Sequence, residues 1–236
     1  MRGQATTDAN MRPMSEEPMP SGIPERLIEA TISLLASEGP SAIKARTVAA
    51  EAGMSTMVVY SHFGGIPELL RATVDYGFDE MRRGFEQAEN TNDPIADLFG
   101  MALAARAMAR ANPHLYDAMF GLSNRATYRP TRGKPEVLSG HSPAFQSAYA
   151  HLTGACERLA DSGRVAEIDP VAVAAAMWSF VHGYITLELA NHFTEFDDPV
   201  KEVFLPMGVT FCVGLGDDRA SSLASHEKAL NLSLAR

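Results

Sequence analysis

The sequence of 236 residues is poor in the side chains on which redox and metal chemistry depend. Its two cysteines, Cys156 and Cys212, form no metal-binding or redox spacing, and its seven histidines are scattered. It contains neither a His-Glu-x-x-His motif nor a phosphate-binding glycine loop. No nucleophile, base and orienting group can be assembled from it. We therefore expect no enzyme activity, no cofactor and no metal site, with both thiols buried in a reducing cytoplasm.

Strand patterns are also missing, since no run of alternating apolar and polar residues and no internal repeat occurs. Hydrophobic residues nonetheless make up 46% of the chain, enough for a sizeable core. They recur at helical spacing between breaks that contain Gly or Pro, and the N-terminus lacks the apolar core of a signal peptide. The sequence predicts a cytoplasmic, all-α protein with an N-terminal three-helix head and a helical bundle behind it.

Positive charge is scarce as well. The chain has 20 lysines and arginines against 29 acidic residues, which gives a net charge of −9. Much of the affinity of DNA-binding proteins comes from cations that meet phosphates, so this balance predicts weak non-specific binding that is sensitive to salt. DNA binding is still compatible with the sequence because Lys44 and Arg46 lie together, and helix N-termini donate backbone amides to phosphates.

A helix-turn-helix pattern occupies residues 44–70 and organises the rest of the chain. A small residue, Ala49, lies where the two short helices would touch, and Gly53 lies where the chain must turn and positive φ is required. Ser55 is placed to cap the second helix, and Val59 is the branched residue that would anchor it. The predicted helices span 43–52 and 56–63. The alternative is a helical hairpin that reads no DNA.

This stretch resembles the DNA-binding head of the TetR family of repressors. The residues that carry the resemblance are Ala49, Gly53, Met54, Ser55, Val59, Tyr60, His62, Phe63, Leu69 and Leu70. The family often has Thr or Ser at the position of Val58 and Lys at that of Ile66, so this chain departs from the pattern at two contact positions. Val58 could only pack on a thymine methyl group.

The resemblance implies which residues touch DNA. Those at the positions of Thr56, Met57, Val58 and Ser61 would face bases, and those of Thr47, Tyr60 and His62 would meet phosphates. The candidate DNA-binding residues are Lys44, Arg46, Thr47, Ser55, Thr56, Met57, Val58, Tyr60, Ser61 and His62.

Cap, Pro and Gly signals divide the remaining chain. Further helices are predicted from Pro24 to the Gly39-Pro40 break, and over 66–90, 95–111, 114–121, 143–162, 170–191 and 199–214. The predicted domains are a disordered tail (1–22), a helix-turn-helix domain (23–68), a ligand-binding and dimerisation domain (69–216) and a loose C-terminal tail (217–236).

A second signature lies in the helix predicted over 170–191. Trp178, His182 and Gly183 resemble the Trp-x-x-x-His-Gly pattern of one class of TetR C-terminal domains. The run 171–190 is apolar enough to be considered as a transmembrane helix. Because it contains His182 and Glu188, we expect instead a helix buried in a bundle or a dimer, and no membrane contact.

The resemblance implies a homodimeric repressor that binds a palindromic operator of double-stranded DNA and is released by a small apolar effector. A two-fold four-helix seam is expected from the last two main helices, built on the apolar residues Val173, Met177, Phe180, Val181, Phe204, Met207, Val209 and Phe211. The alternatives are a regulator controlled by a protein partner or by no ligand, and a helical enzyme.

An effector cavity is predicted within the bundle. Its candidate lining residues are Met101, Met108, Tyr116, Phe120, Tyr149, Trp178 and His182. Flexible thioethers suit a cavity that accepts a foreign shape, and two ring N–H groups on one helical face call for partners. Each of these residues could equally be ordinary core.

Overall fold

A computed structural model of the chain describes residues 22–88, 91–120 and 142–235. These residues form helices and turns and contain no strand, which confirms the predicted all-α class over the part of the chain described. Except for Gly22, the predicted N-terminal tail lies outside these residues. The helices are α1 (Ile23–Glu38), α2 (Ala45–Glu51), α3 (Thr56–Phe63), α4 (Ile66–Ala88), α5 (Pro94–Ala111), α6 (Pro113–Phe120), α7 (Pro143–Asp161), α8 (Pro170–Leu189), α9 (Leu205–Gly214) and α10 (Arg219–Leu234), with a 3₁₀ turn η1 (Pro40–Ala42) and a π turn η2 (Val200–Phe204).

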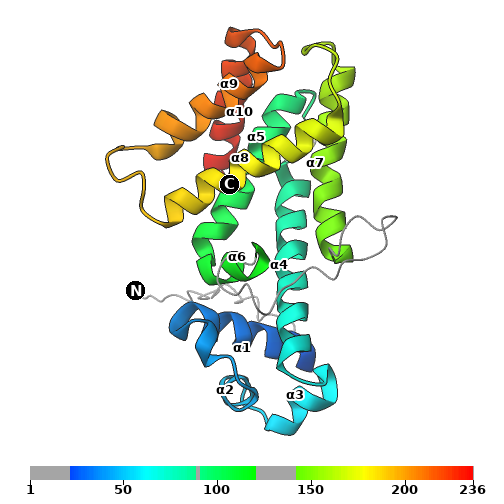
Figure 1. Ribbon diagram of the computed structural model, residues 1–236, viewed down its shortest axis with the longest axis vertical. Helices are drawn as coiled ribbons and strands as arrows, with labels where there is room; N and C mark the ends of the chain where they lie inside the picture. The colour runs from blue at the N-terminus through cyan, green and yellow to red at the C-terminus, as the bar shows by residue number, and fades with distance from the viewer. Residues whose placement is uncertain (1–21, 89–90, 121–141, 236) are drawn as a thin grey trace, which may run out of the picture.

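Helices α1, α2 and α3 pack as a separate head, which lies at the lower end of the molecule in Figure 1. Ala49 and Val59 are almost completely buried where α2 and α3 meet. Gly53 has a φ of 66°, and the amide of Met54 donates to the carbonyl of Ala49 at 2.7 Å. The predicted roles of Ala49, Gly53 and Val59 in the turn are therefore confirmed. Phe63 is partly buried against the same core.

Helix α4 connects the head to the body. Its Leu69 belongs to the core of the head, whereas Val74, Phe78, Met81 and Phe85 belong to the larger core of the body. The helix has 23 residues, a length of about 35 Å at 1.5 Å per residue. A single continuous helix thus contributes to both cores, and Figure 1 shows it running from the head into the body.

Helix α5 is the centre of the body and contacts α4, α7, α8 and α10. A paired charge fixes its position against α8, because the Arg106 guanidinium donates to both oxygens of Glu188 at 2.8 and 2.6 Å. Tyr184 adds a longer hydrogen bond of 3.4 Å to the same carboxylate. Bidentate pairs of this kind specify geometry as well as energy.

The predicted loose C-terminal tail is wrong, because residues 219–234 form the regular helix α10, packed on α5 and α9. The Asp218 carboxylate caps it by accepting from the amide of Ser221. Its inward face consists of Ser222, Ser225, His226 and Ala229, and it therefore shows almost no apolar periodicity. The packing is made by small residues and polar contacts that a hydrophobic pattern cannot reveal.

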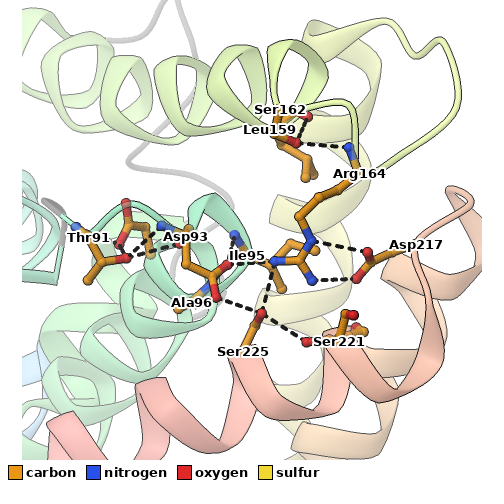
Figure 2. A network of polar contacts seen from close by, with 12 residues as sticks. Thr91, Asp93, Ile95, Ala96, Leu159, Ser162, Arg164, Asp217, Ser221 and Ser225 are labelled. Carbon is orange, nitrogen blue, oxygen red and sulfur yellow. Dashed lines mark hydrogen bonds and ion pairs between the residues drawn. The ribbon is translucent and has the colours of Figure 1, made fainter.

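Arg164, in the connection between α7 and α8, ties three distant segments together (Figure 2). It donates to both oxygens of Asp217 at 3.1 and 2.8 Å and to Asp93, the N-cap of α5, at 2.8 Å. It also donates to the Ser225 hydroxyl on α10, which in turn donates to Asp93 at 2.7 Å. The network holds together the start of α5, the α9–α10 turn at Asp217 and helix α10 at Ser225.

Gly208 marks the closest approach of α9 to α10. A Cβ atom placed at Gly208 would overlap the imidazole of His226, which is held because its Nδ1 donates to the carbonyl of Ser222. We expect Gly208→Ala to lower the free energy of unfolding by about 1–3 kcal/mol, the usual cost of overpacking. On the same helix, a Cβ at Gly214 meets nothing within 4 Å. Gly214→Ala is the matched control and should be neutral in chemical denaturation.

Candidate DNA-binding face and ligand cavity

The recognition helix α3 buries one side and exposes the other. Val59 is fully buried, whereas Met57 is 73% and Tyr60 53% exposed. Ser61 and His62 are also exposed, and Thr56 and Val58 are half-buried. Two large apolar or aromatic side chains in water on an eight-residue helix indicate a surface built to contact something else.

The start of α2 adds cations and a locked hydroxyl. The side chains of Lys44 and Arg46 are exposed. Thr47 accepts from the Lys44 amide and donates to the carbonyls of Lys44 and Ala42. The Thr47 hydroxyl is therefore already hydrogen-bonded at the start of α2 and is less available to bind a phosphate than the sequence suggests.

Ser55 occupies the N-cap position of α3 but does not cap it as predicted. Its side chain makes no hydrogen bond to the first-turn amides, and it is exposed. The amide of Val58 instead bonds to the backbone carbonyl of Ser55 at 3.0 Å. The exposed Ser55 hydroxyl is therefore free of a capping role and open to contact from outside the protein.

In the body, three aromatic side chains contact the imidazole of His182 on α8, and three more pack on those. Trp178 lies 4.2 Å and Phe120 4.1 Å from the imidazole, measured between ring centres. Tyr149 packs edge-on against Trp178 at 5.4 Å. The remaining members are Tyr116, Phe78 and Phe145. Phe145 was not among the predicted residues, although its four-residue spacing from Tyr149 could have indicated it.

The side chain of His182 is half-buried, and only one of its two ring nitrogens has a hydrogen-bond partner among the described residues. Its Nδ1 forms a hydrogen bond with the hydroxyl of Tyr116, whereas the buried Nε2 atom forms none with them. Burial lowers the pKa of His182 to about 3, so the ring is neutral at physiological pH. Burial also raises the pKa of the Tyr116 hydroxyl, which therefore keeps its proton.

A cavity of about 20 Å³ adjoins this cluster, with room for about one water molecule. Of the predicted lining residues, Met101, Trp178 and His182 line it, and Met177 and Leu152 do so unpredicted. Tyr116, Phe120 and Tyr149 lie in the aromatic cluster behind the wall. An effector larger than water would have to displace side chains of this cluster.

Met108 does not line this cavity. It borders a separate groove of about 620 Å³ where α1 of the head meets α4, α5 and α6 of the body. The side chains of Tyr76, Ala107 and Leu115 lie along the same groove. Polar side chains such as Glu29 and Glu80 contribute to the lining of the groove, whereas the cavity at His182 is lined almost entirely by apolar side chains.

Helix α8 presents a second unpartnered surface. It is long and apolar enough to cross a bilayer by length and composition, yet only a third of that apolar stretch is buried. Val171 is 61% and Leu187 45% exposed, and Met207 on the neighbouring α9 is 36% exposed. Between them, α8 exposes the small residues Ala172, Ala175, Ala176, Ser179 and Gly183. We call this surface the α8 face.

Most residues predicted for a dimer seam are instead core. The side chains of Val173, Met177, Val181, Phe204 and Val209 are buried within the protomer. The burial of Val173, Met177 and Val181 follows from the packing of α8 on α5 and α7, which uses these larger side chains and leaves the small ones outward. A seam on this helix therefore has to use the α8 face.

The described residues contain no group of three or more His, Cys, Asp or Glu side chains that could hold a metal ion. Cys156 and Cys212 are both free and buried, and burial raises the pKa of each thiol.

A helix-turn-helix head with an open recognition helix, joined by one long helix to an α-helical body, defines a DNA-binding transcription regulator. Family comparison agrees. Residues 27–73 match the model described as bacterial regulatory proteins, tetR family, and residues 98–207 match the tetracyclin repressor-like C-terminal domain. The chain belongs to the TetR family of transcriptional regulators.

One curated relative is the HTH-type transcriptional repressor DrrR1 of Streptomyces coeruleorubidus, 32% identical over 133 residues. The match covers 56% of this chain and 45% of that protein, so the chain spans less than half the length of this relative. A protein of unknown function from Rhodococcus sp. RHA1 has a similar fold, with a TM-score of 0.69, 23% identity and coverage of 86% of this chain and all of that one. A TetR family regulator from Marinobacter aquaeolei VT8 gives a TM-score of 0.61, 18% identity and coverage of 83% and 96%.

Proposed function

We propose that the chain acts in the cytoplasm as a homodimeric repressor that binds a near-palindromic operator and releases it when a small apolar molecule enters the cavity at His182. The observation that carries the DNA-binding part is the exposed side of α3, where Met57 and Tyr60 project into solvent, and the exposed cations Lys44 and Arg46 at the start of the preceding helix support it. The domain limits of 23–68 for the head and 69–216 for the body belong to this proposal, with α10 now added to the body.

Dimerisation follows from the size of the recognition helix. Eight residues span about 12 Å, enough to read only a few base pairs, so useful specificity requires a second copy. The exposed small residues of the α8 face support a close helix–helix seam around a two-fold axis. The two heads would then meet half-sites about one helical turn, roughly 34 Å, apart or a small multiple of it.

Release by an effector requires differential binding between two arrangements of the heads. A hundred-fold loss of operator affinity needs about 2.7 kcal/mol of coupling. Helix α4 is suited to transmit it because Phe78 and Phe85 belong to the body core and Leu69 to the head core. The Trp178, His182 and Gly183 signature, and with it the Trp-x-x-x-His-Gly class, remains part of the proposal.

The DNA-binding part is tested by selecting bound duplexes from a random pool at low salt. We expect enrichment of a near-palindrome. Lys44→Ala should weaken binding to all sequences and reduce the salt slope by about 1, since it removes one phosphate contact. Thr56→Ala or Ser61→Ala should instead change sequence preference. Failure to enrich any duplex would contradict the function.

The effector part is tested by screening small molecules for release of the selected operator. Trp178→Ala and His182→Ala should each abolish release by a compound that frees the wild-type protein. Ala107→Trp, which fills the groove at α1, is the control and should leave release intact. If Ala107→Trp abolishes release and the other two variants do not, the effector site lies in the groove. If no compound releases the operator, the result favours control by a protein partner.

A further inference from the structure

The hydrogen-bond pattern around His182 determines which ring nitrogen carries the proton. Tyr116 is fully buried, and its hydroxyl has one hydrogen-bond partner among the described residues, Nδ1 of His182. A neutral imidazole has one N–H and one lone pair, so this contact can be made in two ways.

In the first arrangement, Tyr116 donates its O–H to the lone pair of Nδ1, and the ring proton lies on Nε2. One buried donor, the Nε2 N–H, is then left without a partner. In the second, Nδ1 donates to the Tyr116 oxygen, and two buried groups are left over: the Tyr116 O–H and the lone pair of Nε2. Each unmade buried hydrogen bond carries a free-energy cost, so the first arrangement is favoured.

We infer that His182 holds its proton on Nε2 and presents it as a lone donor at the cavity, so that the effector of the proposed function is an apolar molecule with a hydrogen-bond acceptor, such as a carbonyl oxygen, and not one that offers only a donor. This inference rests on the proposed function for the location of the ligand. His182 lines the cavity, and the rest of the wall is almost entirely apolar. A carbonyl would satisfy Nε2, whereas an N–H or O–H held toward it would meet another donor.

Tyr116 is in this view a positioning residue, since it acts on the ligand only by setting the proton of His182. Trp178 stacks its ring edge-on to the imidazole at 4.2 Å and limits rotation of the ring. The preference for an acceptor is therefore set by Tyr116 on α6, and His182 on α8 makes the contact with the ligand.

The proton position is measured on full-length protein labelled with ¹⁵N-histidine, by long-range proton–nitrogen correlation spectra. The His182 signals are assigned by their absence in His182→Gln. We expect the pattern of an Nε2–H ring in the wild type and a loss of this preference in Tyr116→Phe. An Nδ1–H ring in the wild type overturns the inference, whether or not any ligand binds.

Ligand preference is measured by calorimetry with three compounds of similar size: chromone, which offers a carbonyl acceptor, indole, which offers a donor, and naphthalene, which offers neither. Chromone should bind at least about ten-fold more tightly than the other two, a difference of about 1.4 kcal/mol. Tyr116→Phe should reduce the preference and His182→Leu should abolish it while naphthalene still binds. Equal or tighter binding of indole overturns the inference alone. Failure of all three to bind, with an Nε2–H ring present, overturns the cavity as the effector site and with it the proposed mode of release.

Discussion

Gly183→Arg on the α8 face is expected to abolish operator binding without unfolding the protein. A Cβ atom at Gly183 meets nothing within 4 Å, and the residue is exposed, so the protomer has room for the new side chain. Across a two-fold seam, however, each arginine would face its own copy or bury its charge against alanines. Like charges brought together cost several kcal/mol, enough to weaken the dimer by about 100-fold or more.

The oligomeric state is measured by sedimentation velocity and the operator affinity by titration. Wild-type protein is expected to sediment as a dimer at micromolar concentration and Gly183→Arg as a monomer. The matched control is Gly154→Arg on α7, where a Cβ also meets nothing within 4 Å. It adds the same charge and the same helix former and should remain dimeric. A Gly183→Arg protein that stays dimeric and binds the operator would remove the α8 face from the proposed seam.

Arg164→Leu is expected to produce the largest loss of stability. The carboxylate of Asp217 is only 3% exposed and that of Asp93 20% exposed, and both would lose their cation. Removing one partner of a buried pair costs about 3–5 kcal/mol because the other charge is left uncompensated. For a chain of this size, that lowers Tm by about 10 °C. Thermal unfolding followed by circular dichroism measures it.

Arg219→Leu, at the exposed start of α10, is the control for loss of one positive charge and should change Tm little. Asp217→Asn in the Arg164→Leu background should recover part of the loss by removing the stranded charge. A Tm for Arg164→Leu within two degrees of wild type, a margin well below the expected shift of about 10 °C, would show that the network contributes little.

The same network predicts an acid dependence. Burial raises the pKa of Asp93, but hydrogen bonds from Ser225 and from the Ala96 amide, together with the charge of Arg164, outweigh it and leave the pKa below its usual value. A carboxyl with a lowered folded-state pKa stabilises the protein above its unfolded pKa and loses that contribution as pH falls through the folded value. The advantage of wild type over Arg164→Leu should therefore shrink below about pH 4.

The head could be predicted closely from sequence because its determinants are local. Gly53 at a positive φ and the buried pair Ala49 and Val59 occupy fixed offsets within about ten residues. Helix starts such as that of α5 could also be predicted, because the N-cap residue Asp93 and the following Pro94 act only on the first turn of the helix. In both cases, the residues that interact are close together in the sequence as well as in the structure.

The predictions that were wrong concern which face of a helix packs against the rest of the protein. Apolar side chains of α8 such as Val173 and Val181 were assigned to a seam, but they fill the protomer core and leave alanines and Gly183 outside. Helix α10 was missed because Ser222, Ser225 and His226 are its buried residues. The sequence predicts Trp178 and His182 in the wall of a cavity, and both line one, yet the size of that cavity, about that of one water molecule, depends on packing that residue spacing does not describe.

The position of α10 has a consequence for how the protein is made. The core of the head is complete within residues 27–69, so it can form while the ribosome is still adding the body. The N-cap of α5 at Asp93, by contrast, acquires its partner Ser225 only 132 residues later. The body therefore lacks part of its polar network until Ser225 has been synthesised, whereas the core of the head needs nothing beyond Leu69.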